Sequence, residues 1–200
     1  RVGDASAGNR LLCAADAETA KTLAEELNKF NAERKDIEAY VLLQAIEQLE
    51  STPQAYPIAF VYGTDWHQGV IGIVAGKLKE RYNIPAFVMS VEHDEVKGSA
   101  RSIPGIDLGA LVMAAKEKGI LTKGGGHTMA AGFSLNEENL PAFKEFAGEY
   151  VRDKLGNEAV VPVIGIDGVI SLSGANLDLA EKIKSIEPFG AGNPEPRIVI

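Results

Sequence analysis

The sequence of 200 residues lacks several features that mark particular classes of protein. Its single cysteine, Cys13, allows neither a disulfide within the chain nor a cysteine-based zinc site. No apolar run approaches the roughly 20 residues that cross a bilayer, and no signal peptide opens the chain, so we expect a cytoplasmic protein without a membrane partner. The chain starts at Arg1 rather than at a methionine, which favours a piece of a longer protein.

An excess of basic residues is also missing. The formal net charge is −8, whereas proteins that bind nucleic acid over much of their surface usually show a basic face. The acidic excess is uneven, because residues 1–50 carry 10 acidic and 6 basic residues while residues 61–150 carry 11 and 9. A polyanion would therefore dock locally, and the middle of the chain is the better place for it.

The most distinctive stretch is glycine-rich and runs from Lys123 to Gly132. We expect Gly124, Gly125 and Gly126 to form a tight turn with positive φ, whose N–H groups gather around an anionic oxygen. His127 follows at once as a hydrogen-bond donor or proton-transfer group.

A second polar motif supports the same chemistry. Ser99 and Arg101 lie two residues apart, so on an extended strand they share a face, and the guanidinium can grip a phosphate bidentately. Taken singly, the glycines are consistent with an ordinary turn and Arg101 with a surface salt bridge. Taken together, they favour a phosphate site.

A long helix is predicted before this region, over residues 16–52. No glycine or proline occurs between Asp16 and Leu49, and Asp16 is a good N-cap. At about 1.5 Å per residue the helix would be roughly 50 Å long, so it either bridges two bodies or pairs in a homodimeric coiled coil. Its apolar positions recur at spacings of three and four, interrupted at Arg34: Ala20, Leu23, Leu27, Phe30, Ile37 and Val41.

The central domain, residues 57–155, alternates strand and helix patterns. Its order of β-α-β-β-α-β-α indicates an α/β fold with a mixed β-sheet flanked by helices. The strands are expected at Ile58–Tyr62, Ala86–Val91, Lys97–Ser102 and Ala131–Leu135, and the helices at Val70–Tyr82, Ile106–Lys118 and Leu140–Leu155.

The loop after the first of these strands carries Trp66 and His67 at the end of the sheet where ligands often bind. His67 could reach a phosphate or a base. Trp66, the only tryptophan, either offers a face for stacking or belongs to the core.

The last part, residues 160–200, has the short alternating pattern of a small β-barrel. A short amphipathic helix is expected at Leu177–Ile186, and a stiff proline-rich loop follows it.

Four motifs stand in order along the chain: Trp66-His-Gln-Gly-Val-Ile-Gly-Ile-Val-Ala75, Gly98-Ser-Ala-Arg-Ser102, Gly124-Gly-Gly-His127 with Met129-Ala-Ala-Gly132, and Pro188-Phe-Gly-Ala-Gly-Asn-Pro-Glu-Pro196. Together they closely resemble the RecJ family of bacterial single-strand-specific 5′→3′ DNA exonucleases, in the DHH phosphoesterase superfamily. The resemblance implies that residues 1–15 are the tail of a catalytic DHH domain and that 16–52 form the helix joining two lobes. It also implies that 57–155 are the DHH-associated domain and that 160–200 begin an oligonucleotide-binding barrel.

The same resemblance implies roles for single residues. Ser99 and Arg101 match the pair that holds the 5′-terminal phosphate, and the turn from Gly124 to His127 matches the group beside the metals at the next backbone phosphate, where His127 would assist catalysis. His67 and Gln68 are similar to positions that face the cleft. The family's two metal ions, manganese or magnesium, are held by the DHH domain, whose Asp-His-His run is absent here, so we expect no metal site and no cleavage by this chain alone.

The sequence leaves two alternative functions open. One is a small-oligonucleotide or cyclic-dinucleotide phosphodiesterase of the same superfamily. The other is an RNA-binding module like the C-terminal domain of alanyl-tRNA synthetase. For the longer protein the resemblance implies 5′-phosphorylated single-stranded DNA, a helicase and a single-strand-binding protein as partners, in DNA repair and recombination. The chain itself could dimerise through Leu23, Leu27 and Phe30.

Overall fold

The computed structural model describes residues 3, 6–53, 55–156, 164–190 and 192–200. The chain divides into two compact units, residues 1–160 and residues 161–200, and each is described by itself. None of the helices in the described part of the chain combines the length and the apolar character that a bilayer crossing requires.

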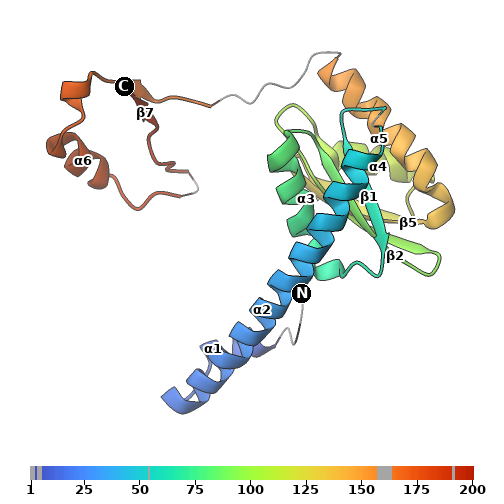
Figure 1. The fold of residues 1–200 in the computed structure, drawn as a ribbon, viewed down its shortest axis with the longest axis horizontal. Helices are drawn as coiled ribbons and strands as arrows, with labels where there is room; N and C mark the ends of the chain where they lie inside the picture. Colours follow the sequence, from blue (N-terminus) through green and yellow to red (C-terminus); the bar gives the residue numbers. More distant parts are fainter. Residues whose placement is uncertain (1–2, 4–5, 54, 157–163, 191) are drawn as a thin grey trace. The chain divides into compact units, whose positions relative to one another are not determined.

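The first unit is built on a five-stranded mixed sheet with the order β1-β2-β3-β5-β4 (Figure 1). Only the pair β1 and β2 is parallel; every other neighbouring pair is antiparallel. The strands are β1 (Ala59–Thr64), β2 (Ala86–Glu92), β3 (Glu95–Arg101), β4 (Lys123–His127) and β5 (Ala130–Asn136).

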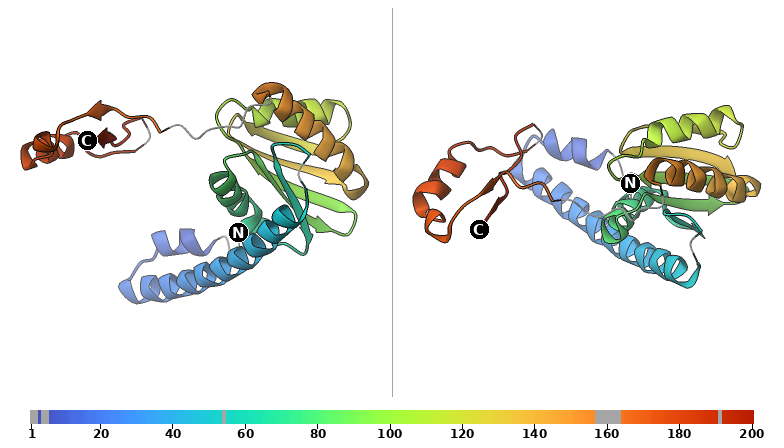
Figure 2. Two further views of the ribbon diagram at one scale, coloured as in Figure 1. Left: turned by 45° about the horizontal axis from the view of Figure 1, so that its top comes forward. Right: turned by 90° about the horizontal axis from the view of Figure 1, so that it is seen from above.

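Helices cover both faces of this sheet (Figure 2). One face packs against α2 (Ala17–Ser51) and α3 (Gln68–Tyr82), and its core includes Val61, Val74 and Val88. The other face packs against α4 (Leu108–Glu117) and α5 (Leu140–Leu155), with the short 3₁₀ turn η1 (Glu137–Asn139) leading into α5. The core of this second face contains a cluster of aromatic rings, Phe60, Phe87, Phe133 and Phe143, among aliphatic side chains.

The long helix is confirmed as α2. Asp16 caps it, since its Oδ1 accepts a hydrogen bond of 2.8 Å from the N–H of Thr19. Its second half packs on the sheet, with Val41, Ala45 and Leu49 buried against β1 and α3. The predicted bridging helix is therefore anchored on the sheet over its second half.

Glu38 forms a largely buried electrostatic link between α2 and α3. Its side chain is 8% exposed and is paired with Arg34 on its own helix and with Lys77 on α3. The hydrogen bond from Lys77 contributes most to holding the pKa of Glu38 below its ordinary value. Arg34, which interrupts the apolar stripe in the sequence, therefore pairs with the carboxylate that contacts α3.

The first half of α2 contacts the short helix α1 (Ala7–Leu12). Arg10 of α1 lies 4.0 Å from Glu26 of α2, and Gly3 lies against the ring of Phe30. The stripe of Leu23, Leu27 and Phe30 is half-buried rather than exposed, because this N-terminal segment packs on the helix.

The predicted glycine turn is wrong. Gly124, Gly125 and Gly126 lie in the edge strand β4, and none of them has a positive φ. The chain instead reverses at Thr128 and Met129, and β4 pairs with β5 as a hairpin. The sheet therefore has one strand more than the sequence pattern indicated.

The second unit contains little regular structure within its described residues. It has the two-residue strands β6 (Gly168–Val169) and β7 (Ile198–Val199), which pair in parallel, the 3₁₀ turn η2 (Leu172–Gly174) and the helix α6 (Leu177–Lys184). Asn176 caps α6 through a 3.0 Å hydrogen bond from the N–H of Leu179. The start of the predicted barrel segment, residues 160–163, and residue 191 of the proline-rich loop lie outside the described residues.

Candidate nucleic-acid interface

The sheet has one region that no helix covers. On the α3 side, α3 packs over β2 and β3 but makes few contacts with β5 or β4. The residues of β3, β5 and β4 that face this side form three rows across the sheet, each joining directly paired residues. The rows are Arg101–Ala130–His127, Ser99–Gly132–Gly125 and Lys97–Ser134–Lys123.

Ser99 and Arg101 share this face, as their spacing predicted. One guanidinium nitrogen, Nη1, donates to Ser99 Oγ at 3.1 Å and to the carbonyl oxygen of Ala100 at 2.9 Å. Arg101 makes no ion pair with an acidic residue in the described part of the chain, so its charge is available to an anion. The pair is half-buried at the margin of α3, where Gly72 faces both side chains.

His127 lies in the same row as Arg101, with Ala130 between them. Two strand spacings separate their backbones, which is about 10 Å. The N–H of Met129 donates to His127 Nδ1 at 3.3 Å, so the neutral imidazole carries its proton on Nε2. His127 therefore offers Nε2–H as a donor to a ligand on this face.

The glycines of β4 serve close packing on one face and openness on the other. A Cβ at Gly124 would lie 2.5 Å from Val112 Cγ1 of α4, and one at Gly126 would collide with the backbone of Ala130 and Ala131. Gly125 points to the α3 side, where nothing lies within 4 Å of its Cβ position. Together with Gly132 it leaves the middle row open to a ligand beside Ser99.

The N-terminus of α4 holds the tip of the β4–β5 hairpin. Asp107 caps α4 by accepting a 3.0 Å hydrogen bond from the N–H of Ala110, and its other oxygen lies 3.5 Å from the hydroxyl of Thr128. The N–H of Leu108 donates to the carbonyl oxygen of Thr128 at 3.1 Å. These contacts fix the backbone next to His127.

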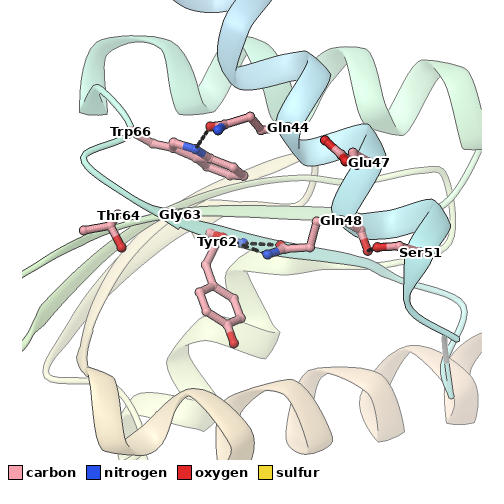
Figure 3. A pocket seen from close by; sticks show the side chains of 8 residues that line it. All are labelled: Gln44, Glu47, Gln48, Ser51, Tyr62, Gly63, Thr64 and Trp66. Atoms are coloured by element: carbon pink, nitrogen blue, oxygen red, sulfur yellow. Dashed lines mark hydrogen bonds between the residues drawn. The ribbon is translucent and has the colours of Figure 1, made fainter.

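Trp66 belongs to the core, which was one of the two interpretations of its sequence position. It is 4% exposed, and its Nε1–H donates to Gln44 Oε1 at 2.8 Å (Figure 3). The indole therefore has no free face on which a base could stack. It borders a polar hollow of about 570 Å³ between α2 and β1, at the opposite edge of the sheet from β4.

Gln48 closes part of the β1 edge in the same hollow. Its amide accepts from the N–H of Tyr62 at 2.8 Å and donates to the carbonyl oxygen of Tyr62 at 3.0 Å, as a neighbouring strand would (Figure 3). The hollow is therefore a contact region between α2 and the sheet, away from Ser99 and Arg101.

His67 and Gln68 are exposed at the first turn of α3. His67 caps the helix, since its Nδ1 accepts a 2.9 Å hydrogen bond from the N–H of Gly69. One turn further along α3, Gly72 lies next to Ser99 and Arg101. His67 and Gln68 therefore lie on the side of the sheet that carries the polar rows.

Sequence reasoning missed two further basic residues on this face, Lys97 and Lys123. Their spacing in the sequence could have indicated this, because residues an even number of positions apart on a strand share a face. Lys97 precedes Ser99 by two residues, and Lys123 precedes His127 by four. Within the described residues there is no group of three or more histidine, cysteine, aspartate or glutamate side chains that could hold a metal ion, so the donor set for a two-metal centre is not found there.

Comparison with known proteins identifies the family. Residues 55–153 match the DHHA1 domain, and residues 166–200 match the RecJ OB domain. The chain belongs to the RecJ family. The single-stranded-DNA-specific exonuclease RecJ of Haemophilus influenzae is 36% identical over 203 residues, which cover 98% of this chain and 35% of that protein. The RecJ of Bacillus subtilis is 32% identical over 202 residues, covering 100% of this chain and 25% of the relative.

A solved structure agrees with this assignment. The crystal structure of RecJ in complex with Mg²⁺ from Thermus thermophilus has a TM-score of 0.82 and 29% sequence identity, and the match covers 96% of this chain and 29% of that one. The α/β fold with a mixed sheet is thus the RecJ fold of this region. The chain spans about a quarter to a third of the length of the RecJ relatives named here.

Proposed function

We propose that this chain is the substrate-binding part of a RecJ-like, metal-dependent 5′→3′ exonuclease that acts on single-stranded DNA. In this proposal Ser99 and Arg101 hold the 5′-terminal phosphate, and His127 with the adjoining backbone of β4 contacts the next backbone phosphate. His67 and Gln68 border the same cleft. Trp66 has no part in binding, because it is buried.

The observation that carries the proposal is the row that joins Arg101 to His127. A guanidinium without a carboxylate partner among the described residues and an imidazole with its Nε2–H free face the same open part of the sheet. Both are donors suited to phosphate oxygens, and the guanidinium can bind two of them at once. Ala130 between them, and Gly132 and Gly125 in the neighbouring row, are small and leave room for a sugar and a base.

Binding of the terminal phosphate would determine where the longer protein cuts the strand. A pocket that fixes the terminal phosphate sets the distance from the strand end to the bond that is cut, so digestion proceeds from the 5′ end. The described residues supply no metal-ligand cluster, and we assign the manganese or magnesium ions, and hydrolysis itself, to the part of the longer protein outside this chain. A helicase and a single-strand-binding protein are the partners expected of such an enzyme in the bacterial cytoplasm.

The test is equilibrium binding to this chain at low salt. Short fluorescent oligonucleotides are compared in pairs: 5′-phosphate against 5′-hydroxyl, and single-stranded DNA against RNA. We expect the 5′-phosphorylated DNA to bind more tightly than the 5′-hydroxyl form. Tighter binding of RNA with no effect of the 5′ end would favour the RNA-binding alternative, and equal binding of all four would contradict the proposal for this chain.

A further inference from the structure

We propose that Lys97 and Lys123 form a second phosphate-binding position on the same sheet face, for the backbone beyond the two phosphates at the strand end. This inference rests on the proposed function. It extends the site from the recognition of an end to the recognition of a short length of strand, and it assigns a role to two residues that sequence motifs did not single out.

The register of the sheet places the two lysines together. Lys97 pairs with Ser134 of β5, and Ser134 pairs with Lys123 of β4. Side chains alternate along a strand, so Lys97 faces the same side as Ser99 and Arg101, and Lys123 faces the same side as Gly125 and His127. The lysine row is therefore parallel to the row of Arg101 and His127, with the small residues Gly132 and Gly125 between them.

Both lysines are accessible. The side chain of Lys97 is 41% exposed, and its ion-pair partner among the residues that the structure describes is Glu95, 3.8 Å away and itself 51% exposed. Such a long, solvated contact contributes little, so a phosphate can replace it. Lys123 is exposed and forms no ion pair in the part of the chain that the structure describes.

The position of the row limits what can reach it. Arg101 lies four positions after Lys97 on β3, which is about 13 Å along the strand. A mononucleotide bound at Arg101 is too short to span this distance, whereas a strand of several nucleotides is long enough. Beyond the lysines the next row pairs Glu95, at the start of β3, with the neutral Asn136, and the N–H of Glu137 donates to the carbonyl oxygen of Asp94 nearby, so no basic residue continues the row there. The positive track therefore ends at the lysine row.

The test compares ligand lengths. The double variant Lys97→Gln and Lys123→Gln and the unmodified chain are titrated with 5′-phosphorylated oligothymidylates of one, two, four and six nucleotides. We expect unchanged binding of the mononucleotide and a loss of roughly tenfold for the six-nucleotide strand at low salt. The slope of log affinity against log salt should fall by about 1.4 for that strand, since each phosphate contact to a single strand contributes about 0.7.

The matched control is the double variant Lys116→Gln and Lys144→Gln, on α4 and α5 at the other face of the sheet. It removes the same charge, so any effect of net charge alone appears there too. The inference is overturned if the lysine variant loses affinity equally at every length, if it loses none, or if the control loses as much. Circular dichroism and thermal melting show whether each variant is folded.

The inference and the proposed function fail in different ways. If the unmodified chain binds 5′-phosphorylated and 5′-hydroxyl strands with equal affinity, the proposed end recognition is wrong for this chain. If that preference is present but the length dependence is unaffected by the lysine variant, the second position alone is wrong.

Discussion

Replacing Arg101 by alanine removes the charged donor that the proposed end-binding site depends on. In the folded chain this guanidinium is held by Ser99 Oγ and by the carbonyl oxygen of Ala100, through one of its nitrogens. Within the described part of the chain, its other N–H groups have no hydrogen-bond partner and are available to a ligand. A hydrogen bond between charged groups contributes about 1.5–3 kcal/mol, so the variant should bind a 5′-phosphorylated strand about 10 to 150 times more weakly.

The 5′-hydroxyl strand distinguishes a specific contact from a general loss of charge. We expect its affinity to change by less than about threefold in Arg101→Ala, because this strand has no terminal phosphate for the guanidinium to contact and a solvated charge contributes little to a distant phosphate. Arg101→Lys should fall between, since it keeps the charge but loses the planar fork. Fluorescence anisotropy gives the affinity of each protein for both strands, and Lys116→Ala, on the opposite face, is the charge control. Equal losses for the two strand ends would refute the role of Arg101 in sensing the end.

Three further predictions concern the scaffold. Gly124→Ala should lower the free energy of unfolding by about 1–3 kcal/mol, because the added Cβ meets Val112, whereas Gly125→Ala should leave stability within about 0.5 kcal/mol; urea denaturation measures both. Glu38→Gln should lower the free energy of unfolding by about 1–3 kcal/mol at pH 7. The pKa of Glu38 is lowered in the folded state, so its contribution is present above its unfolded value near 4.5 and is lost as the pH falls through the folded pKa; the variant and the original chain should therefore converge in acid melts. Gln44→Ala leaves the Nε1–H of Trp66 without its acceptor, so the emission of this single tryptophan should shift to the red as water reaches the indole; an unchanged spectrum would contradict the burial that the hydrogen bond maintains.

Local signals in the sequence were enough for most of the helices and strands. The helix α2 followed from an N-cap at Asp16 and the absence of glycine and proline, both of which act over a few residues. The common face of Ser99 and Arg101 followed from the period of a strand and needed only that β3 be regular.

The features that sequence reasoning missed depend on contacts between distant residues. The glycines of β4 looked like a turn because glycine favours turns, but the structure requires them where Val112 of α4 and Ala131 of β5 come close. The choice between the core and a stacking face for Trp66, which the sequence left open, involves Gln44, the acceptor of its Nε1–H, 22 residues earlier on α2. The row that joins Arg101 to His127 depends on strand register, which no local pattern states.

The attachment of α2 has a mechanical consequence. Contacts from Glu38, Gln44 and Gln48 hold the second half of the helix to α3 and β1, so this half and the sheet turn together. The first half continues for about 20 residues, or roughly 30 Å, without a glycine or proline at which it could bend. This half of α2 is therefore stiff, and a rotation of the sheet by about five degrees would displace its N-terminal end by roughly 2–3 Å. A displacement of the sheet is therefore transmitted along α2 to the helix α1, which packs on its first half.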